Sequence, residues 1–395
     1  MIRVSKRLNK LPHYAVNELA TAKKRMLAQG VDVIDLSVGD ADIPPPEIAV
    51  RTLNDALADQ AMSRYSFQIG LIEFREAVAR YMKRRFDVTV DPMTEVLPLI
   101  GSKNGLSHLP FAILDAGDIC IIPEPGYPGY FGTYLSEAEV LPYPLEASKD
   151  FLIELDDLSE DQLERAGLVF LNYPNNPTSA IAPIDYLTRT ISTCRKHDIV
   201  IAYDNPYCEM TFDGYKAPSI LELPDAREVS LEFHSLSKTF CMTGWRLGWA
   251  TGSAELIAAL QKVKSYVDTG PFLAVQKAGA AVLDSAETLV ESMQAEFARR
   301  RDAAVRSFRE TGFEVEPPKA TMYLWIETPA GLTSAQFAQR VLEDEAVVVL
   351  PGSALGSSGE GYFRIAMTVG ADRMQQAAER IGRVLNKVRT VGAAT

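Results

Sequence analysis

The chain has 395 residues, of which 47% are hydrophobic and 23% charged, a composition typical of a folded globular protein and not of a disordered or fibrous one. Its 40 basic and 52 acidic residues give a net charge of −12, which disfavours nucleic acids and anionic membranes because both attract basic surfaces. A length near 400 predicts two domains, or one large domain with a smaller one.

The cysteines and histidines show no metal-ligand spacing. There are four of each, scattered along the chain without a Cys-x-x-Cys pair, so we expect neither a disulfide framework nor a metal site. No apolar run reaches the roughly 18–20 residues that span a bilayer. The basic first ten residues lack the apolar segment of a secretory signal. These features predict a cytoplasmic protein.

Taken in chain order, the first clear element is an amphipathic helix over residues 72–86. Short apolar runs then alternate with helical patterns up to about residue 204. The predicted strands are residues 95–100, 118–122, 167–171 and 198–204, and the predicted helices are residues 104–114 and 183–197. Such alternation is typical of βαβ units, which build a largely parallel sheet buried on both faces.

The pattern changes after residue 285. A long charged helix over residues 285–311 precedes a strand at 321–326, another helix, and strands at 347–350 and 362–366. This order predicts an α+β domain at the C-terminal end. We expect residues 1–47 to form an N-terminal arm and part of the small domain, residues 48–284 the large domain, and residues 285–395 the rest of the small domain.

Polar segments follow four strands of the large domain, where open α/β sheets bind their ligands. They are residues 101–103, 172–177, 204–207 and 235–238. Phosphate suits the first and last of these. Backbone N–H groups at a helix start after Gly101 favour an anion, and Ser235, Ser237 and Arg246 add hydroxyl donors and a bidentate guanidinium.

Two charged residues at these strand ends could carry chemistry. Lys238 lies among small polar residues and could attack a carbonyl as a Schiff-base nucleophile. Asp204 could hold a pyridinium N–H. Taken singly, each has a simpler interpretation: a lysine is usually a solvated charge, and an aspartate after a strand is as readily a helix N-cap. The glycines of residues 352–359 precede a strand and predict a loop, not a dinucleotide site.

Together, however, the motifs Asn-Asn-Pro-Thr at 175–178, Asp-x-x-Tyr at 204–207 and Ser-x-Ser-Lys-x7-Arg at 235–246 form one pattern. The chain resembles the fold-type I pyridoxal phosphate enzymes, in particular the class I/II aminotransferases. Within them it is most similar to the LL-diaminopimelate aminotransferases and their bacterial relatives. The stretches that carry this resemblance are residues 4–12, 95–103, 232–239, 242–246 and 359–364.

The resemblance implies an α/β fold, with a large domain around a mostly parallel seven-stranded sheet and a smaller α+β domain. It implies an enzyme of amino-acid biosynthesis that uses pyridoxal 5′-phosphate. Such an enzyme moves an amino group between an L-amino acid and a 2-oxo acid, with 2-oxoglutarate or pyruvate as the common partner.

The resemblance also assigns roles around the cofactor. Lys238 would bind it covalently and move the substrate proton, and Asp204 would pair with its ring nitrogen. Tyr207 and Asn176 would hydrogen-bond its phenolic oxygen, and Tyr127 would stack on its ring. The residues implied for the phosphate are Ser102, Lys103, Ser235, Ser237 and Arg246.

Five further positions follow from the same resemblance. Tyr65 matches a tyrosine that reaches the phosphate from the neighbouring subunit, so a homodimer is implied. Arg364 matches the arginine that binds the substrate α-carboxylate, and Gly39 matches a loop glycine close to that carboxylate. Tyr14 and Ile69 are expected beside the substrate, where Asn176 also contributes.

The chain departs from the family pattern at several positions. Ile69 precedes Gly70 where an acid is expected, and Asn104 follows Lys103 where glutamate is common. Since a distal ammonium group needs a carboxylate partner, these changes predict a substrate with an apolar or neutral polar side chain. Ser179 replaces a glycine, which costs about 1–2 kcal/mol if the turn needs a positive φ. Residues 205–206 are Asn-Pro in place of Ala-Ala.

Two alternatives stay open at this point. A lyase or cyclising enzyme of amino-acid secondary metabolism would share the same motifs, because the early chemical steps are common. A regulator that uses this fold as an amino-acid sensor would carry a basic DNA-binding domain before it. The resemblance here begins within the first dozen residues, which disfavours the regulator.

Overall fold

A seven-stranded sheet forms the centre of the larger part of the molecule. The computed structural model describes residues 3–11, 16–67 and 69–392. In spatial order the strands are β2 (Val96–Leu99), β8 (Gly248–Gly252), β7 (Ser230–Ser235), β6 (Val200–Asp204), β5 (Ala166–Leu171), β3 (Ile119–Glu124) and β4 (Glu139–Pro144). Strand β8 runs in the direction opposite to the other six strands, which all run the same way. The predicted mostly parallel seven-stranded sheet is therefore confirmed.

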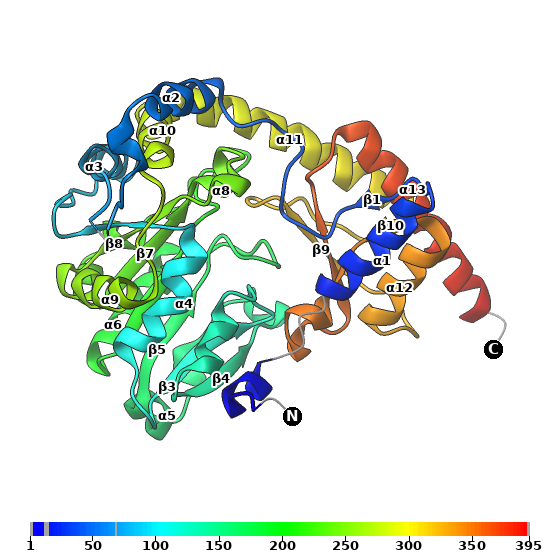
Figure 1. Cartoon of the computed structure of the whole chain (residues 1–395). Coiled ribbons are helices and arrows are strands. Elements are labelled where there is room, and N and C mark those ends of the chain that lie inside the picture. The colour runs from blue at the N-terminus through cyan, green and yellow to red at the C-terminus, as the bar shows by residue number, and fades with distance from the viewer. Residues whose placement is uncertain (1–2, 12–15, 68, 393–395) are drawn as a thin grey trace.

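Helices cover both faces of this sheet (Figure 1). Side chains alternate between the faces of a strand, so neighbouring residues enter different cores. Leu97 packs with helices α4 (Ser102–Ile113) and α9 (Ala254–Val267) on one face. Val96 packs with α3 (Ile72–Phe86) and α10 (Leu273–Asp284) on the other. Helix α6 (Ile184–Lys196) covers β5 and β6 on that second face. Burial on both faces explains why β2, β3 and β5 are almost entirely apolar.

A second group of elements contains the C-terminal part of the chain. Strands β11 (Leu350–Pro351), β12 (Tyr362–Ala366) and β9 (Tyr323–Glu327) form an antiparallel sheet, and β1 (Ile34–Asp35) pairs parallel with β10 (Val347–Val348). Helices α11 (Ala286–Glu310), α12 (Ser334–Glu345) and α13 (Ala371–Gly392) pack around them (Figure 1). Ile34 and Leu36 share one core with Phe308, Phe337 and Phe363. The domain limits given above stay a prediction.

The remaining elements are short or lie at the periphery. The other α-helices are α1 (Val16–Ala28), α2 (Glu47–Leu57), α5 (Glu160–Arg165), α7 (Ala226–Val229) and α8 (Leu236–Thr239). The 3-10 turns are η1 (Lys6–Lys10), η2 (Gln60–Ser63), η3 (Tyr130–Leu135), η4 (Ala147–Lys149), η5 (Leu155–Asp157), η6 (Ile220–Glu222), η7 (Thr243–Trp245), η8 (Gly352–Leu355) and η9 (Ser357–Gly359).

The structure differs from the sequence prediction mainly where short strands change partners. The single strand expected at residues 347–350 is two strands, because β10 pairs with β1 while β11 pairs with β12. Strands β4 and β8 were not predicted. β8 is a five-residue segment with glycine at both ends, so it gives little apolar signal. Residues 352–359 form turns and no α-helix, as predicted.

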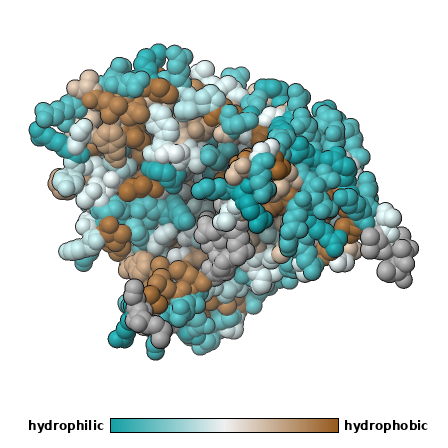
Figure 2. All heavy atoms as spheres, turned by 45° about the vertical axis from the view of Figure 1, so that its right-hand side comes forward, coloured by the Kyte–Doolittle hydropathy of each residue, from teal (hydrophilic) through white to brown (hydrophobic). Residues whose placement is uncertain are grey.

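The surface is unevenly apolar. Figure 2 shows a mainly hydrophilic surface on the side of α12 and α13, with apolar groups on the opposite side. The exposed large apolar residues include Tyr65, Phe67, Ile69, Tyr266, Val267 and Phe272. Their two segments meet where Ser66 Oγ donates a hydrogen bond of 2.6 Å to the Thr269 carbonyl. No helix within the described ranges is long and apolar enough to cross a membrane.

Removing the Phe363 ring tests how much the core around Phe308, Phe337 and Phe363 contributes to stability. Phe363 is fully buried, with its ring centroid 4.9 Å from that of Phe337 and 5.7 Å from that of Phe313. We expect Phe363→Ala to lower the free energy of unfolding by about 3–5 kcal/mol, because it leaves a cavity. The control Leu27→Ala, at a half-exposed position, should change it by less than about 0.5 kcal/mol. Equal effects in denaturant unfolding would contradict the assigned core.

Candidate active site

A cavity of about 240 Å³ lies at the carboxyl ends of the sheet strands, next to β9 and β12. It gathers twelve of the residues that the sequence singled out. These are Gly39, Ser102, Lys103, Tyr127, Asn176, Asp204, Tyr207, Ser235, Ser237, Lys238, Arg246 and Arg364. Parallel strands end at the same edge of a sheet, which is why segments far apart in the sequence meet here. The individual roles of these residues remain predictions.

Three predicted site residues are not brought into this cavity. Tyr65 is 72% exposed and Ile69 is 56% exposed, and neither lines the cavity of its own chain. Tyr14 lies outside the described residues. The prediction that Tyr65 serves a neighbouring subunit therefore remains a prediction about an assembly.

Lys238 lies in the short helix α8, which directly follows β7. Ser235 caps this helix, since its side chain accepts a hydrogen bond from the Ser237 N–H. The Lys238 Nζ donates a 2.6 Å hydrogen bond to the Gly39 carbonyl. A Cβ at Gly39 would lie 3.3 Å from this Nζ and would overlap the Tyr323 hydroxyl. Gly39 is therefore required by the close approach of two side chains.

Asp204, the last residue of β6, is a buried carboxyl group with half of its hydrogen-bonding capacity unused. It is 3% exposed, and the Tyr130 hydroxyl donates a 2.6 Å hydrogen bond to its Oδ2. Its Oδ1 has no hydrogen-bond partner among the described residues. Burial raises the pKa of Asp204 to about 7, although the Tyr130 hydrogen bond and the charge of Lys238 act in the opposite direction. Such a carboxyl group needs a donor that also carries positive charge.

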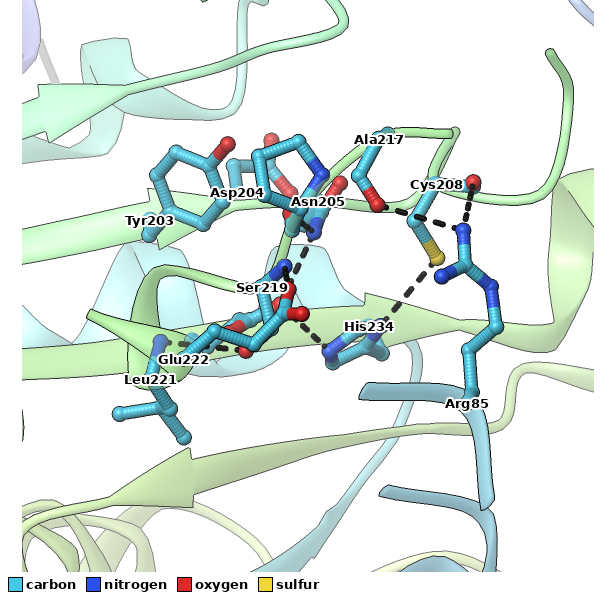
Figure 3. Close-up of polar contacts among 12 residues, drawn as sticks. Arg85, Tyr203, Asp204, Asn205, Cys208, Ala217, Ser219, Leu221, Glu222 and His234 are labelled. Carbon is cyan, nitrogen blue, oxygen red and sulfur yellow. Dashed lines mark hydrogen bonds and ion pairs between the residues drawn. The ribbon is translucent and has the colours of Figure 1, made fainter. Parts of the chain in front are cut away.

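A buried polar network holds the turn that follows Asp204 (Figure 3). The Asn205 Nδ2 donates a 2.9 Å hydrogen bond to Glu232 Oε1, and the His234 Nε2 lies 2.9 Å from the same oxygen. The Ser219 hydroxyl donates to Glu232 Oε2. Glu232 is fully buried, so the hydrogen bonds from Asn205 and Ser219 replace water around its carboxylate. Asn205 departs from the family pattern, and this network accounts for it.

Positively charged groups gather at the N-terminus of α4. Gly101 caps this helix with φ 69°, and a Cβ there would overlap the Arg246 guanidinium. Arg246 Nη1 donates to Ser237 Oγ at 3.3 Å and to the Thr243 carbonyl at 2.7 Å. Burial and the charge of Arg246 lower the pKa of Lys103. Two cations beside the N–H groups of a helix start form a site suited to a phosphate group.

Arg364 projects from β12 into the other side of the cavity. Its Nη1 donates a 2.6 Å hydrogen bond to Asn176 Oδ1, and its Nη2 donates to the Ser37 carbonyl. The guanidinium carbon lies 4.2 Å from the centroid of the Tyr323 ring. Its Nε has no hydrogen-bond partner within the described part of the chain, and the side chain is 5% exposed. A fixed, buried guanidinium of this kind is suited to a carboxylate.

Two tyrosines of the site were missed by the sequence analysis. Tyr130 binds Asp204 and stacks on Phe170, with ring centroids 4.8 Å apart. Tyr323 lines the cavity, and its hydroxyl lies 3.0 Å from that of Tyr207. Tyr323 lies in a predicted strand, and Tyr130 belongs to no motif that the sequence analysis identified. The one available signal was that a buried tyrosine needs a partner for its hydroxyl.

Ser179 has the positive φ that the glycine of the family pattern suggested, with a value of 63°. Its Oγ donates a 2.9 Å hydrogen bond to the Tyr323 carbonyl and lies 2.6 Å from Thr321 Oγ1. These contacts join the turn of residues 175–179 to the start of β9. They offset part of the backbone strain of a non-glycine residue in this conformation.

Asn104 does not line the cavity of its own chain. Its Oδ1 accepts a hydrogen bond from the Lys264 ammonium group, and its Nδ2 donates a 3.0 Å hydrogen bond to Asp268. Lys264 is fully buried and also lies 2.9 Å from Asp268. The side chain of Asn104 therefore completes a structural ion pair behind α4.

A second and larger cavity, of about 640 Å³, lies between α3, α11 and residues 209–216. Within the described ranges it shares no lining residue with the first cavity. Its charged groups are mostly paired, as in the 2.9 Å contact between Arg85 and Glu209. The Lys238 amine, the half-satisfied Asp204 carboxyl group and the cations at the α4 N-terminus all belong to the smaller cavity, so size alone does not identify the active site.

Known proteins match this chain over nearly its whole length. The sequence profile of the family "Aminotransferase class I and II" matches residues 31–381. The LL-diaminopimelate aminotransferase of Moorella thermoacetica is 43% identical over 385 residues, which cover 97% of this chain and 99% of that protein. The enzyme of the same name from Aquifex aeolicus is 44% identical over 382 residues, covering 96% of this chain and 99% of that protein.

Solved structures agree with this match. Substrate-bound BacF from Bacillus subtilis superposes with a TM-score of 0.94 at 33% identity, covering 97% of this chain and 98% of that one. A probable N-succinyldiaminopimelate aminotransferase from Thermus thermophilus gives a TM-score of 0.89 at 35% identity, covering 94% and 100%. None of these relatives is named as a lyase or a cyclising enzyme. The chain therefore belongs to the class I and II aminotransferases and has the fold-type I architecture and the transaminase activity of that family.

Proposed function

We propose that this aminotransferase binds pyridoxal 5′-phosphate in the cavity around Lys238 and moves an amino group from an L-amino acid to a 2-oxo acid, with 2-oxoglutarate or pyruvate as acceptor. One observation carries the proposal. The Oδ1 of Asp204 has no hydrogen-bond partner among the described residues, and Asp204 lines the same cavity as Lys238 and the cations at α4. Each of these three features matches one chemical group of the cofactor.

The residues fit the cofactor group by group. The α4 N-terminus, with Ser102, Lys103 and Arg246, would hold the phosphate. Asp204 Oδ1 would accept a hydrogen bond from the protonated ring nitrogen, which would satisfy a buried oxygen that now lacks a donor. Tyr127 would lie against the ring. When bound, the cofactor supplies an electron sink for the substrate α-carbon.

Lys238 is the residue best placed to hold the cofactor and to move the proton at the substrate α-carbon. Its Nζ donates a hydrogen bond to the Gly39 carbonyl, which holds the amine in the cavity. An amine held in place can accept and return a proton at one position, which is the requirement for general acid–base catalysis.

Arg364 and Asn176 are the groups best placed to bind the substrate. Two parallel N–H···O hydrogen bonds from Arg364 would hold the α-carboxylate, because the guanidinium presents a planar fork of donors. Ring contact with Tyr323 and hydrogen bonds to Asn176 and Ser37 keep this fork in position. Orientation of the carboxylate places the α-carbon relative to Lys238.

We infer that the active assembly is a homodimer in the cytoplasm. Tyr65, Phe67 and Ile69 form an exposed apolar group beside Tyr266 and Phe272, and a surface of this kind favours association. In a dimer Tyr65 would reach the phosphate of the partner subunit. The four unpaired cysteines are consistent with a reducing compartment.

The proposed substrate has an apolar or neutral polar side chain. LL-diaminopimelate, the substrate in the names of the most similar relatives, is the reference compound against which this is judged. Ile69 supports a substrate other than LL-diaminopimelate, because it stands where the family pattern has an acid. Asn104 contributes nothing to this argument, since its side chain is engaged by Lys264 and Asp268.

Replacing the reactive lysine tests the activity directly. We expect Lys238→Ala to abolish transamination and the absorbance band of covalently bound cofactor, because the amine that holds the cofactor is gone. The assay is an absorbance titration of the purified holoenzyme with a panel of amino acids, including LL-diaminopimelate. The control Lys262→Ala, at an exposed position on α9, should behave as wild type. Full activity in Lys238→Ala would refute the assignment.

Asp204 predicts a specific pH dependence for the cofactor-free protein. Its pKa rises from an ordinary value near 3.8 to about 7 on folding, so the folded chain binds the proton more tightly than the unfolded chain. The free energy of unfolding should therefore fall as pH rises from about 4 to about 7. Asp204→Asn removes this titration, so the variant should exceed wild type by up to about 4 kcal/mol at pH 8 and match it near pH 4.

Denaturant unfolding of both cofactor-free proteins at the two pH values measures this difference. A gap of the same size at both pH values would mean that the carboxyl group does not titrate as described. The cofactor should also bind the variant more weakly, because asparagine cannot pair with a charged ring nitrogen.

The substrate preference is tested at Ile69. If this position lines the cavity of the partner subunit, Ile69→Glu should improve kcat/KM for amino acids with a distal ammonium group relative to apolar ones. A carboxylate beside the ammonium would satisfy a charge that is otherwise buried without a partner. The control Ile69→Gln adds polarity without charge and should not change the ratio. Unchanged selectivity in Ile69→Glu would mean that the position is remote from the substrate.

A further inference from the structure

A second tyrosine hydroxyl lies beside the predicted catalytic groups. Tyr323 is the first residue of β9, is 2% exposed and lines the same cavity as Lys238. Its hydroxyl is 3.0 Å from that of Tyr207 and fills the space that a side chain at residue 39 would need. The sequence motifs gave this residue no role.

Three contacts fix the position of Tyr323. The Ser179 hydroxyl donates a 2.9 Å hydrogen bond to its carbonyl, and its own N–H donates to Thr321 Oγ1 at 3.1 Å. The Arg364 guanidinium lies over its ring at 4.2 Å. The hydroxyl is therefore held at one place, and Tyr207 is the partner that it meets there.

The charges around the two phenols make them unequal. Burial acts to raise the pKa of Tyr323, but the charges of Lys238 and Arg364 and the hydrogen bond with Tyr207 together outweigh it, so the pKa lies below its ordinary value. Burial raises the pKa of Tyr207 well above its ordinary value, with further contributions from Tyr323 and Asp204. Of the pair, Tyr323 is the one that releases its proton first.

This inequality decides the direction of the hydrogen bond between them. A neutral phenol has one proton to donate. When both phenols keep their protons, either hydroxyl can donate, and Tyr323 is the better donor because it is the more acidic. When Tyr323 donates, the proton of Tyr207 is available to the cavity. When Tyr323 is ionised, Tyr207 donates to it and its proton is turned away from the cavity.

We propose that Tyr323 is a positioning residue that directs the Tyr207 hydroxyl toward the cofactor site, and that substrate binding at Arg364 strengthens this effect. The inference rests on the proposed function. A carboxylate on Arg364 neutralises a cation that favours ionised Tyr323, so the phenol keeps its proton when the amino acid is bound. Tyr207 then presents its proton to the cofactor site while the amino acid is bound.

A double-mutant cycle on the holoenzyme tests whether Tyr323 acts through Tyr207. We expect Tyr323→Phe to lower kcat about five- to tenfold, roughly the worth of one buried hydrogen bond. KM for the amino donor should change less than about twofold, because the ring under Arg364 remains. In the Tyr207→Phe background the same change should cause no further loss. Independent, additive losses would overturn the proposal.

A second measurement needs no catalytic activity. Ultraviolet titration of tyrosinate in the cofactor-free protein should reveal one tyrosine that ionises below its ordinary range, and Tyr323→Phe should remove it. The matched control Tyr362→Phe, on the neighbouring strand β12 and stacked on Trp325, should leave it in place. Its persistence in Tyr323→Phe would overturn the proposal. An inactive wild-type enzyme with the expected titration would contradict the proposed function and leave the pairing of the two phenols supported.

Discussion

The site depends on one buried carboxyl group that the protein leaves half-satisfied. Asp204 is 3% exposed, and one of its oxygens has no hydrogen-bond partner among the described residues. An arrangement of this kind destabilises the isolated chain, because the charged form loses hydration without gaining a full set of donors. It becomes favourable when a positively charged donor occupies the cavity. Stability and function therefore oppose each other at this position until the site is filled.

Much of the surrounding structure keeps Asp204 from relaxing toward another partner. The Tyr130 hydroxyl occupies Oδ2, and the Asn172 side chain donates a 2.7 Å hydrogen bond to the Asp204 carbonyl. One residue further on, Asn205 is tied to the buried Glu232. These groups hold the end of β6, so Asp204 stays in the lining of the cavity. Rigid support of this kind is what preorganised sites require.

The other half of the site comes from the smaller sheet. Arg364 and Tyr323 belong to β12 and β9, yet they contact Ser37, Asn176 and Tyr207 of other segments. The placement of these two strands against the large sheet thus sets the distance between the Arg364 guanidinium and Lys238. The sequence predicted both strands and the roles of Lys238, Asp204 and Arg364 through motifs with fixed spacing. It could not predict Tyr130, Tyr323 or Glu232, because a buried tyrosine or a glutamate in an apolar strand shows its partner only after folding.

The departures from the family pattern show the same limit of sequence reasoning. At three of the four, the side chain has a local partner: Ser179 bonds to the start of β9, Asn205 binds Glu232, and Asn104 binds Lys264 and Asp268. A change with such a partner preserves the fold and carries no information about substrate. Ile69 differs from these three, because its apolar side chain is 56% exposed and lies four residues after Tyr65 in the chain. An exposed apolar residue in place of an acid, next to a tyrosine expected to serve another subunit, is explained by burial in an assembly. If Ile69 contacts the substrate as proposed, it does so across an interface between subunits, because it does not line the cavity of its own chain.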